Sequence, residues 1–287
     1  MLLEEKNWEE MIAINTRTES VPVALKSAEH YFSPEDLMER HKHLAPDLPG
    51  FLRRDKYPLP TTVDREGYYG DQHFNFWMSG LYDYLEAKKI IGSKKINQYL
   101  DFGAATGRVS RHFAAQENNI EVICADINLK HVRWVNKHLG ENISAFQNSS
   151  IPHLPFEDCS FDLVTAYSVF SHIEVFDHSW LYEIRRILRP GGRLIFTANV
   201  DNWQDIEPSW PVYKALKNHP MFDNDDLGKP LKNDKEVFRW NNSGSYSSVV
   251  FMTSDYLKQE WGKILKVDSV IPFYTGFQTG VSMVKEG

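Results

Sequence analysis

A turn of small residues lies between an apolar run and an amphipathic segment near the middle of the chain. Residues 99–109 read Tyr-Leu-Asp-Phe-Gly-Ala-Ala-Thr-Gly-Arg-Val. Small side chains let a backbone turn sharply and approach a ligand closely. Free amides at the start of the following helix can face a carboxylate or a phosphate. The pattern therefore indicates a ligand-binding turn, of a kind that many nucleotide-binding folds share.

Two acidic residues narrow the chemistry of this turn. Asp101 precedes the turn, and Asp126 ends the next apolar run. An acid at the end of that second strand can accept hydrogen bonds from two ribose hydroxyls. Dinucleotide enzymes share this feature, so Asp126 indicates a ribose without indicating which cofactor carries it. The glycines distinguish the cofactor classes better, because Gly103 and Gly107 with Ala105 between them depart from the G-x-G-x-x-G of NAD-type turns. They fit D-x-G-x-G-x-G with one glycine replaced by alanine.

The elements that must position these residues alternate in type from about residue 96 onward. Asn128 is suited to cap a helix that Gly140 ends, and Asp177 to cap another that ends at Pro190-Gly191-Gly192. Alternating strands and helices imply parallel strands joined by crossover helices, so we expect a doubly wound α/β sheet. The expected strands are residues 96–102, 120–125, 143–147, 163–167 and 194–198.

The flanking regions have a different character. Prolines are scattered through residues 1–92, which we expect to form an N-terminal extension with a helix over 74–91 and to cover the pocket. The stretch up to about Ser27 is equally compatible with a partly disordered leader. Residues 93–287 then form the main domain, interrupted by a polar, solvated insertion at about 200–248. Three more strands, at 247–252, 264–270 and 279–284, and a helix near 254–261 complete it.

Over roughly residues 96–200, the chain resembles the class I S-adenosylmethionine-dependent methyltransferases, in particular those of type 11 and type 12. Four motifs in register carry the resemblance: Asp101–Gly107, Asp126, the "LPF-x-D-x-SFD-x-V" block at Leu154–Val164 and the "L-x-PGG" turn at Leu188–Gly192. The resemblance implies a Rossmann-like, mostly parallel seven-stranded sheet with the insertion after strand five. It also implies S-adenosylmethionine as cofactor and S-adenosylhomocysteine as product.

The resemblance also implies roles for particular residues. Gly103 and Gly107 would shape the loop around the cofactor, Asp101 would orient its methionine amino group, and Asp126 would bind its ribose. Ser150 stands where many relatives carry an acid that touches the adenine amine, so adenine recognition falls to Ser150, Asn148 or a backbone amide. The predicted cofactor-binding residues are Asp101, Gly103, Ala104, Ala105, Gly107, Arg108, Asp126, Ile127, Asn148, Ser150, Tyr167 and Ser168.

Three of the candidate residues, Arg108, Tyr167 and His172, have two interpretations each. Arg108 would meet the cofactor carboxylate or pair with an acid of the scaffold. Tyr167 and Ser168 end strand four, where an open parallel sheet presents its ligand crevice, although Tyr167 also suits a plain core position. His172 is the candidate catalytic residue, as the general base that takes the acceptor proton. Its other interpretation is a hydrogen bond to the loop or a contact with the cofactor, because an activated sulfonium needs no strong base.

A narrower likeness points to the acceptor. Residues 107–109, 168–172 and 180–186 are similar to methyltransferases associated with sugars, glycans or secondary metabolites. That implies a small-molecule acceptor, methylated at a hydroxyl or, alternatively, at an amine. Two other classes of protein compete with this reading. An NAD-linked oxidoreductase is disfavoured by the turn spacing and the Pro-Gly-Gly block, and a non-catalytic S-adenosylmethionine-binding protein of the same fold stays open.

The bulk properties set outer bounds on function. The formal net charge is −7, which disfavours sequence-independent binding of nucleic acid. The 2 cysteines lack a partner at metal or disulfide spacing, and no apolar run reaches membrane-helix length, so we expect a cytoplasmic protein without membrane insertion. Asp201-Asn202 resembles the Asp-Asn pair that metal-dependent O-methyltransferases carry after strand five. It lies further past the Pro-Gly-Gly turn than that family would place it, so we expect no metal. Nothing in the sequence indicates the oligomeric state.

Overall fold

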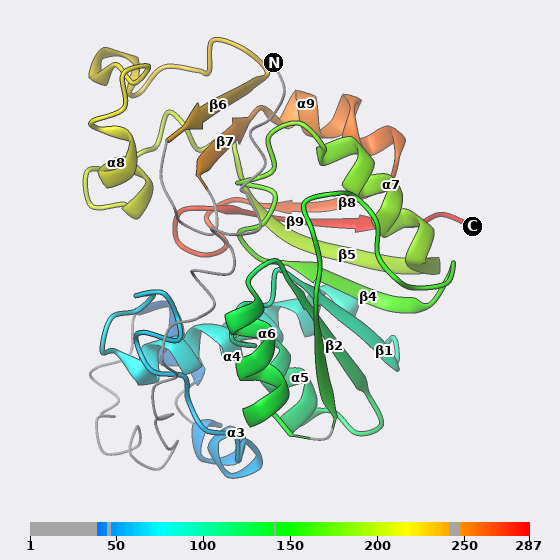
Figure 1. Cartoon of the computed structure of the whole chain (residues 1–287). Coiled ribbons are helices and arrows are strands. Elements are labelled where there is room, and N and C mark those ends of the chain that lie inside the picture. Colours follow the sequence, from blue (N-terminus) through cyan, green and yellow to red (C-terminus); the bar gives the residue numbers. More distant parts are fainter. Residues whose placement is uncertain (1–38, 45–46, 141, 241–246) are drawn as a thin grey trace. The chain divides into compact units, whose positions relative to one another are not determined.

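The computed structural model describes residues 39–44, 47–140, 142–240 and 247–287 (Figure 1). The chain forms two compact units, one ending at Asn148 and the other beginning at Ser149. The predicted leader up to Ser27 lies outside the described residues.

The first unit is built on a parallel three-stranded arrangement. Strand β2 lies between the other two, with Leu100 opposite Ile123 and Ala125 opposite Phe146. Helix α6 packs on β2 and β3, and α5 contacts β2. The strands and their crossover helices are β1 (Gln98–Phe102), α5 (Ser110–Gln116), β2 (Glu121–Asp126), α6 (Leu129–His138) and β3 (Ile143–Gln147). Because all three strands run the same way, their carboxyl ends meet at one edge.

The N-terminal extension packs against α5, where its described part provides one short 3-10 helix and two α-helices. A buried ion pair joins them, because Arg111 of α5 donates to both carboxylate oxygens of Asp55, at 2.7 and 3.1 Å. The indole of Trp77 donates to the same carboxylate at 2.7 Å. Both charges are fully buried and multiply hydrogen-bonded, which is the condition under which a buried ion pair is tolerated. The elements are η2 (Glu39–Leu44), α3 (Leu48–Arg54) and α4 (His73–Ile91).

The second unit has one long central strand, β5 (Leu188–Val200). Residues 193–196 of β5 pair in parallel with β4, and residues 193–198 pair antiparallel with β9. Beyond that point Asn199 and Val200 pair with β7 instead. The other elements of this sheet and its cover are β4 (Phe161–Ala166), α7 (Asp177–Ile187), β7 (Ser248–Met252), α9 (Ser254–Gln259), η4 (Trp261–Lys263), β8 (Lys266–Ile271) and β9 (Thr279–Val284).

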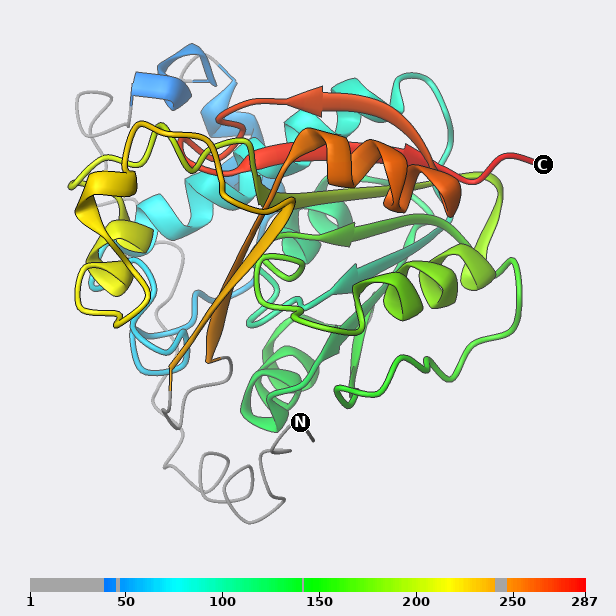
Figure 2. The same ribbon diagram turned by 90° about the horizontal axis from the view of Figure 1, so that it is seen from above.

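The segment after β5 has a core of its own. Trp203 stacks on Phe238 with ring centroids 5.4 Å apart, and Leu216 and Phe251 are fully buried beside them. Figure 2 shows this segment, drawn in yellow and orange, standing to one side of β4, β5 and β9. Its elements are α8 (Pro211–Leu216), η3 (Asn224–Asp226) and β6 (Lys235–Arg239), the last pairing antiparallel with β7. The prediction of a merely solvated insertion is therefore wrong in this respect.

Most predicted elements are confirmed, with two corrections. Asn128 caps α6 by accepting from the Lys130 amide, as expected. Asp177 does not cap α7, because Phe176 holds the cap position. Its carboxylate instead accepts from Trp261 and Tyr256. The eight predicted strands correspond to β1–β5, β7, β8 and β9, while β6 was not predicted. None of the helices in the described part of the chain combines the length and apolar character needed to cross a bilayer.

Candidate functional site

The loop of residues 103–107 in the first unit is hydrogen-bonded to β2. The amides of Gly103 and Ala104 both donate to the Ala125 carbonyl, at 2.8 and 3.2 Å. The Gly107 amide closes the loop by donating to the Ala104 carbonyl at 2.8 Å. Gly103 and Gly107 have φ values of 77° and 73°, in the left-handed region that glycine adopts without steric cost. This backbone path explains why glycine stands at both positions.

Ala105 adopts the same left-handed region, with φ 48°. That region costs an L-residue roughly 1–2 kcal/mol, so alanine is strained where the family pattern has glycine. Its amide donates to Oδ2 of Asp126 at 2.7 Å, a charge-assisted hydrogen bond that offsets part of the strain. The bond ties the loop to the carboxyl end of β2.

Asp126 accepts several hydrogen bonds at this edge of the sheet and is only 8% exposed. Besides Ala105, its carboxylate accepts from the Asn128 amide at 2.8 Å and from Nδ1 of His131 at 3.3 Å, both on Oδ1. A carboxylate has about four lone-pair positions. The three hydrogen bonds therefore leave capacity on Oδ2 for one more donor, which fits a ribose hydroxyl.

His131 and Glu66 were missed by the sequence analysis. Asn128 donates to Glu66 at 2.9 Å, and Nε2 of His131 lies 4.0 Å from the other oxygen of that carboxylate. Burial opposes the charged form of His131, but Asp126 and Glu66 together raise its pKa above the ordinary value. The position of His131, in the first turn of the helix after the acid, was a usable signal. No pattern pointed to Glu66, which comes from the extension.

Asp101 lies within the first unit and is 3% exposed. The hydroxyl of Ser110, the first residue of α5, donates to its Oδ2 at 2.5 Å. The Cys124 thiol donates in turn to that hydroxyl at 3.1 Å. Burial, reinforced by the charge of Asp101, raises the pKa of Cys124 well above its usual range, so this thiol stays protonated. These hydrogen bonds fix the carboxylate of Asp101, which lies in β1 two residues before the loop.

The remaining predicted residues of the first unit differ in placement. Ile127 and Asn148 directly follow β2 and β3. The Ile127 carbonyl accepts from Gln147 at 2.9 Å, and the Asn148 amide donates to the Asp126 carbonyl at 3.1 Å. They therefore share the edge that carries the loop. Arg108 instead donates to the carboxylate of Asp83 in α4, at 2.5 Å, as its scaffold interpretation expects.

In the second unit, Ser168 lies two residues past the end of β4 and has a left-handed conformation, with φ 57°. Its amide donates to the hydroxyl of Thr197 at 2.8 Å, and its own hydroxyl donates to Oε1 of Gln278 at 2.7 Å. Thr197 donates to that same oxygen at 2.8 Å. Gln278 is 4% exposed and was not predicted, since nothing in its neighbourhood of the sequence pointed to a site. It joins the ends of β4, β5 and β9.

The other predicted residues of the second unit lie around this network. Tyr167 is 9% exposed, and its hydroxyl lies 3.4 Å from that of Tyr274. Ser150 is exposed and has no hydrogen-bond partner among the described residues.

His172 is half-buried and has its Nδ1 2.5 Å from the Ser248 carbonyl of β7. A carbonyl can only accept, so Nδ1 carries the proton and donates. The Ser248 hydroxyl returns a hydrogen bond to the His172 carbonyl at 3.1 Å. Burial lowers the pKa of His172 to about 4, although the bond to Ser248 acts in the opposite direction. The imidazole is therefore neutral at pH 7.

Comparison with known proteins bears on the class of the chain. Residues 100–196 match the family model described as "Methyltransferase domain". A relative among curated proteins is the ubiquinone/menaquinone biosynthesis C-methyltransferase UbiE of Ralstonia pickettii, 28% identical over 144 residues. The match covers 49% of this chain and 56% of that enzyme, so the chain spans little more than half the length of this relative.

Two solved structures show the same fold. The Burkholderia thailandensis 1,6-didemethyltoxoflavin-N1-methyltransferase has a TM-score of 0.52 at 13% identity, covering 88% of this chain and 92% of that one. The protein bound to the Haloferax volcanii Trm112 methyltransferase activator has a TM-score of 0.53 at 14% identity, covering 78% and 97%. The Rossmann-like α/β fold predicted from the sequence is thereby confirmed.

Together these findings identify a class I S-adenosylmethionine-dependent methyltransferase domain over residues 100–196. The resemblance stated from the motifs is confirmed at this level. The narrower likeness to sugar, glycan or secondary-metabolite enzymes stays a prediction.

Proposed function

We propose, from the methyltransferase domain of residues 100–196, that this chain transfers the methyl group of S-adenosylmethionine to a small-molecule acceptor. The observation that carries the proposal is the loop of residues 103–107, bound through Ala105 to the carboxylate of Asp126. A left-handed loop of small residues beside an acid at a strand end fits the methionine and ribose parts of that cofactor.

The cofactor, when bound, supplies a methyl group on a sulfonium, and this group needs no further activation. The chain's own part is then to align the acceptor in line with the carbon–sulfur bond and to exclude water. The attacking acceptor atom forms a bond to the methyl carbon as the carbon–sulfur bond breaks, and S-adenosylhomocysteine and a proton are released.

We assign the cofactor-facing roles to the edge formed by β1, β2 and β3. Asp126 binds a ribose hydroxyl through the remaining capacity of Oδ2, and Asp101 orients the methionine amino group. The loop residues Gly103 to Gly107 lie against the cofactor through backbone atoms. Ile127 and Asn148 border the adenine, with Ser150 as the further adenine candidate. Tyr167 and Ser168 line the methyl-donor end.

His172 has two proposed roles. The hydrogen bond to Ser248 and the lowered pKa support anchoring of the loop after β4 to β7. As the alternative, the neutral ring takes the acceptor proton, although a conjugate acid with a pKa of about 4 makes a weak base at pH 7.

The organisation of the chain follows from the same proposal. Residues 1–92 form an extension that covers the pocket, and residues 93–287 form the methyltransferase domain with its insertion at about 200–248. The contacts of Asp55 with Arg111 and of Glu66 with Asn128 support the first part, since they bind the extension to the elements that follow the loop and β2. A cytoplasmic location completes the proposal.

The acceptor atom is proposed to be a hydroxyl oxygen, with an amine nitrogen as the first alternative. A carbon acceptor is the second, because the curated relative is named as a quinone-pathway C-methyltransferase. The test is incubation with methyl-labelled S-adenosylmethionine and panels of phenols, sugars, amines and quinols. Labelled product whose mass spectrum places the methyl on oxygen supports the proposal. Label on nitrogen or carbon selects an alternative, and tight cofactor binding without any product supports a non-catalytic protein.

A further inference from the structure

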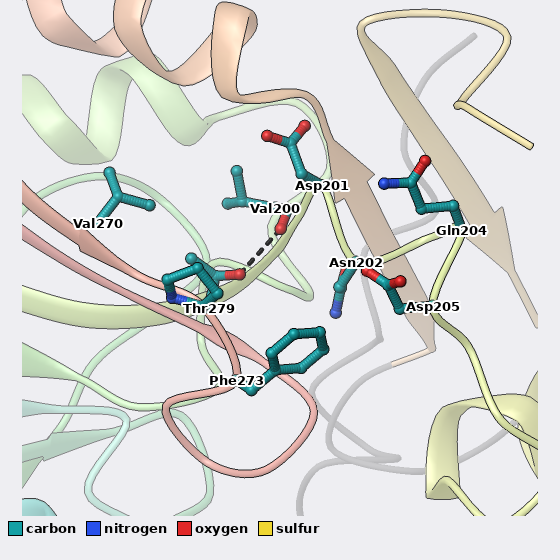
Figure 3. A pocket seen from close by; sticks show the side chains of 9 residues that line it. Val200, Asp201, Asn202, Gln204, Asp205, Val270, Phe273 and Thr279 are labelled. Carbon is teal, nitrogen blue, oxygen red and sulfur yellow. Dashed lines mark hydrogen bonds between the residues drawn. The ribbon is translucent and has the colours of Figure 1, made fainter. Parts of the chain in front are cut away.

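A pocket of about 220 Å³ opens at the carboxyl end of β5 in the second unit, apart from the residues assigned above. Figure 3 shows its side chains coming from the end of β5 and the segment after it, from β8 and the connection that follows it, and from the start of β9. Thr279 closes one side, where its hydroxyl donates to the Val200 carbonyl at 2.8 Å. The lining residues are Val200, Asp201, Asn202, Gln204, Asp205, Val270, Pro272, Phe273 and Thr279.

Asn202, which lines this pocket, has a side-chain oxygen without a hydrogen-bond donor among the described residues. Its side-chain nitrogen donates to the Phe277 carbonyl at 2.7 Å and to Oδ1 of Asn199 at 3.3 Å. Both partners are acceptors, so the orientation of the amide is fixed and its oxygen points elsewhere. Asn202 is 3% exposed, and that buried oxygen has no hydrogen-bond partner in the described part of the chain. A buried oxygen without a donor is costly, so the site is suited to a ligand that brings one.

Two carboxylates give the pocket a negative charge. Oδ1 of Asp201 accepts from the Ser254 amide at 2.9 Å, and the Asp201 backbone is left-handed, with φ 53°. The carboxylate of Asp205 has neither an ion pair nor a hydrogen bond to any described residue, and no lysine, arginine or histidine is among the lining residues. The charge of these two carboxylates is therefore not neutralised within the pocket.

Four of the lining residues are apolar. Val200, Val270, Pro272 and Phe273 provide hydrocarbon surface to the same pocket. A polyol would need donors as well as acceptors, and the two carboxylates and the Asn202 oxygen offer only acceptors, which leaves the Gln204 amide as the donor among these side chains. A divalent metal would need six or more oxygen ligands, which this half-apolar lining does not supply. An ammonium group on an apolar body satisfies both the acceptors and the apolar side chains of this lining.

We propose that this pocket binds a compact organic ammonium ion, with its N–H groups on Asn202 and Asp205 and its apolar body against Phe273 and Val270. If the proposed methyl transfer holds, the ammonium is a handle on the acceptor, because ligands of open α/β sheets bind at the carboxyl ends of strands. Binding of the ammonium itself requires neither the cofactor nor turnover.

The test is titration calorimetry of the full chain at pH 7, without S-adenosylmethionine, using cyclohexylammonium chloride, cyclohexanol and MgCl₂ as separate probes. The ammonium should bind about tenfold or more tightly than the alcohol, since hydrogen bonds to ionised groups are the stronger ones. Its affinity should fall as NaCl is raised, because both carboxylates are solvent-exposed.

Asp205→Asn should weaken ammonium binding about fivefold to tenfold while keeping the shape of the side chain. The matched control is Asp225→Asn, which removes an exposed charge of the same unit outside the pocket and should leave the affinity unchanged. An unchanged melting temperature shows that each variant is folded.

Equal affinity for the alcohol, binding of Mg²⁺ in place of the ammonium, an equal loss in both variants, or no binding of any probe each overturns the proposal. None of these outcomes bears on methyl transfer, which the labelled-acceptor assay tests separately.

Discussion

Replacing Asp126 with asparagine removes one carboxylate oxygen from the junction between β2 and the loop of residues 103–107. The carboxylate accepts from Ala105 on one oxygen and from Asn128 and His131 on the other. Whichever way the new amide turns, its NH₂ group faces at least one of these donors. A buried donor left without an acceptor costs about 1–3 kcal/mol. Because the charge that stabilises protonated His131 is also lost, we expect the free energy of unfolding to fall by about 2–3 kcal/mol.

The assay is urea unfolding followed by circular dichroism at pH 6 and pH 8. The matched control is Glu121→Gln on the same strand, whose exposed carboxylate accepts only from Gln98, at 2.7 Å, among the described residues. We expect the control to stay within about 0.5 kcal/mol of the unmodified chain. A change of the same small size for Asp126→Asn would refute the idea that this carboxylate holds the loop in place.

Four further predictions follow from the backbone conformations and contacts described above. Ala105→Gly should stabilise the chain by up to about 1 kcal/mol in urea unfolding, because glycine adopts φ 48° without the cost that alanine meets; a loss of stability would contradict the strain. Gly80→Ala should destabilise by about 1–3 kcal/mol, since its Cβ would lie 2.1 Å from the Arg108 carbonyl oxygen, and an unchanged melting temperature would show that α4 and Arg108 are not in contact. His172→Ala should lower turnover about 10²–10⁴-fold with cofactor affinity kept if His172 is the base; retained turnover leaves only the anchoring role. The pKa of His172 is lowered to about 4 in the fold, so below pH 6.5 the unfolded chain binds a proton that the folded chain does not. The free energy of unfolding should therefore fall by about 1–3 kcal/mol between pH 6.5 and pH 4. His172→Asn, which keeps a donor to Ser248, should lose this pH dependence of stability.

The sheet strands were largely predictable because their residues carry the pattern locally. β3 and β9 have the predicted bounds, since each is an apolar run bordered by turn residues. The cap at Asn128 was equally local, because the side chain bonds an amide two residues on. Asp177 has the same residue type before a helix, yet its carboxylate is drawn to Trp261, far along the chain. Such competition between local and distant partners leaves no trace in the local sequence.

The insertion shows the same limit on a larger scale. Its apolar residues are spaced without a helical or strand period, so the sequence indicated a solvated segment. The structure brings Trp203, Phe238 and Phe251 together from three separate stretches, with ring centroids 5.0–6.0 Å apart. Only tertiary contacts create that core, and β6 forms because β7 is available to pair with it.

The candidate site divides in a similar way. Gly103, Gly107 and Asp126 were predictable because a sharp turn and a ribose acid demand particular residue types at fixed places. Gln278 and Glu66 reach their partners from distant parts of the chain. A glutamine or a glutamate in such a position has no signature of its own, so only the structure reveals it.

The central claim is that the edge carrying Gly103–Gly107 and Asp126 binds S-adenosylmethionine. Isothermal titration of the purified chain with S-adenosylhomocysteine, with NAD in parallel, tests it most directly. We predict micromolar binding of the first, about −8 kcal/mol, no binding of NAD, and a loss of about 1–3 kcal/mol in the folded Asp126→Ala variant. Binding of NAD alone, or an Asp126→Ala variant with undiminished affinity for S-adenosylhomocysteine, would contradict it.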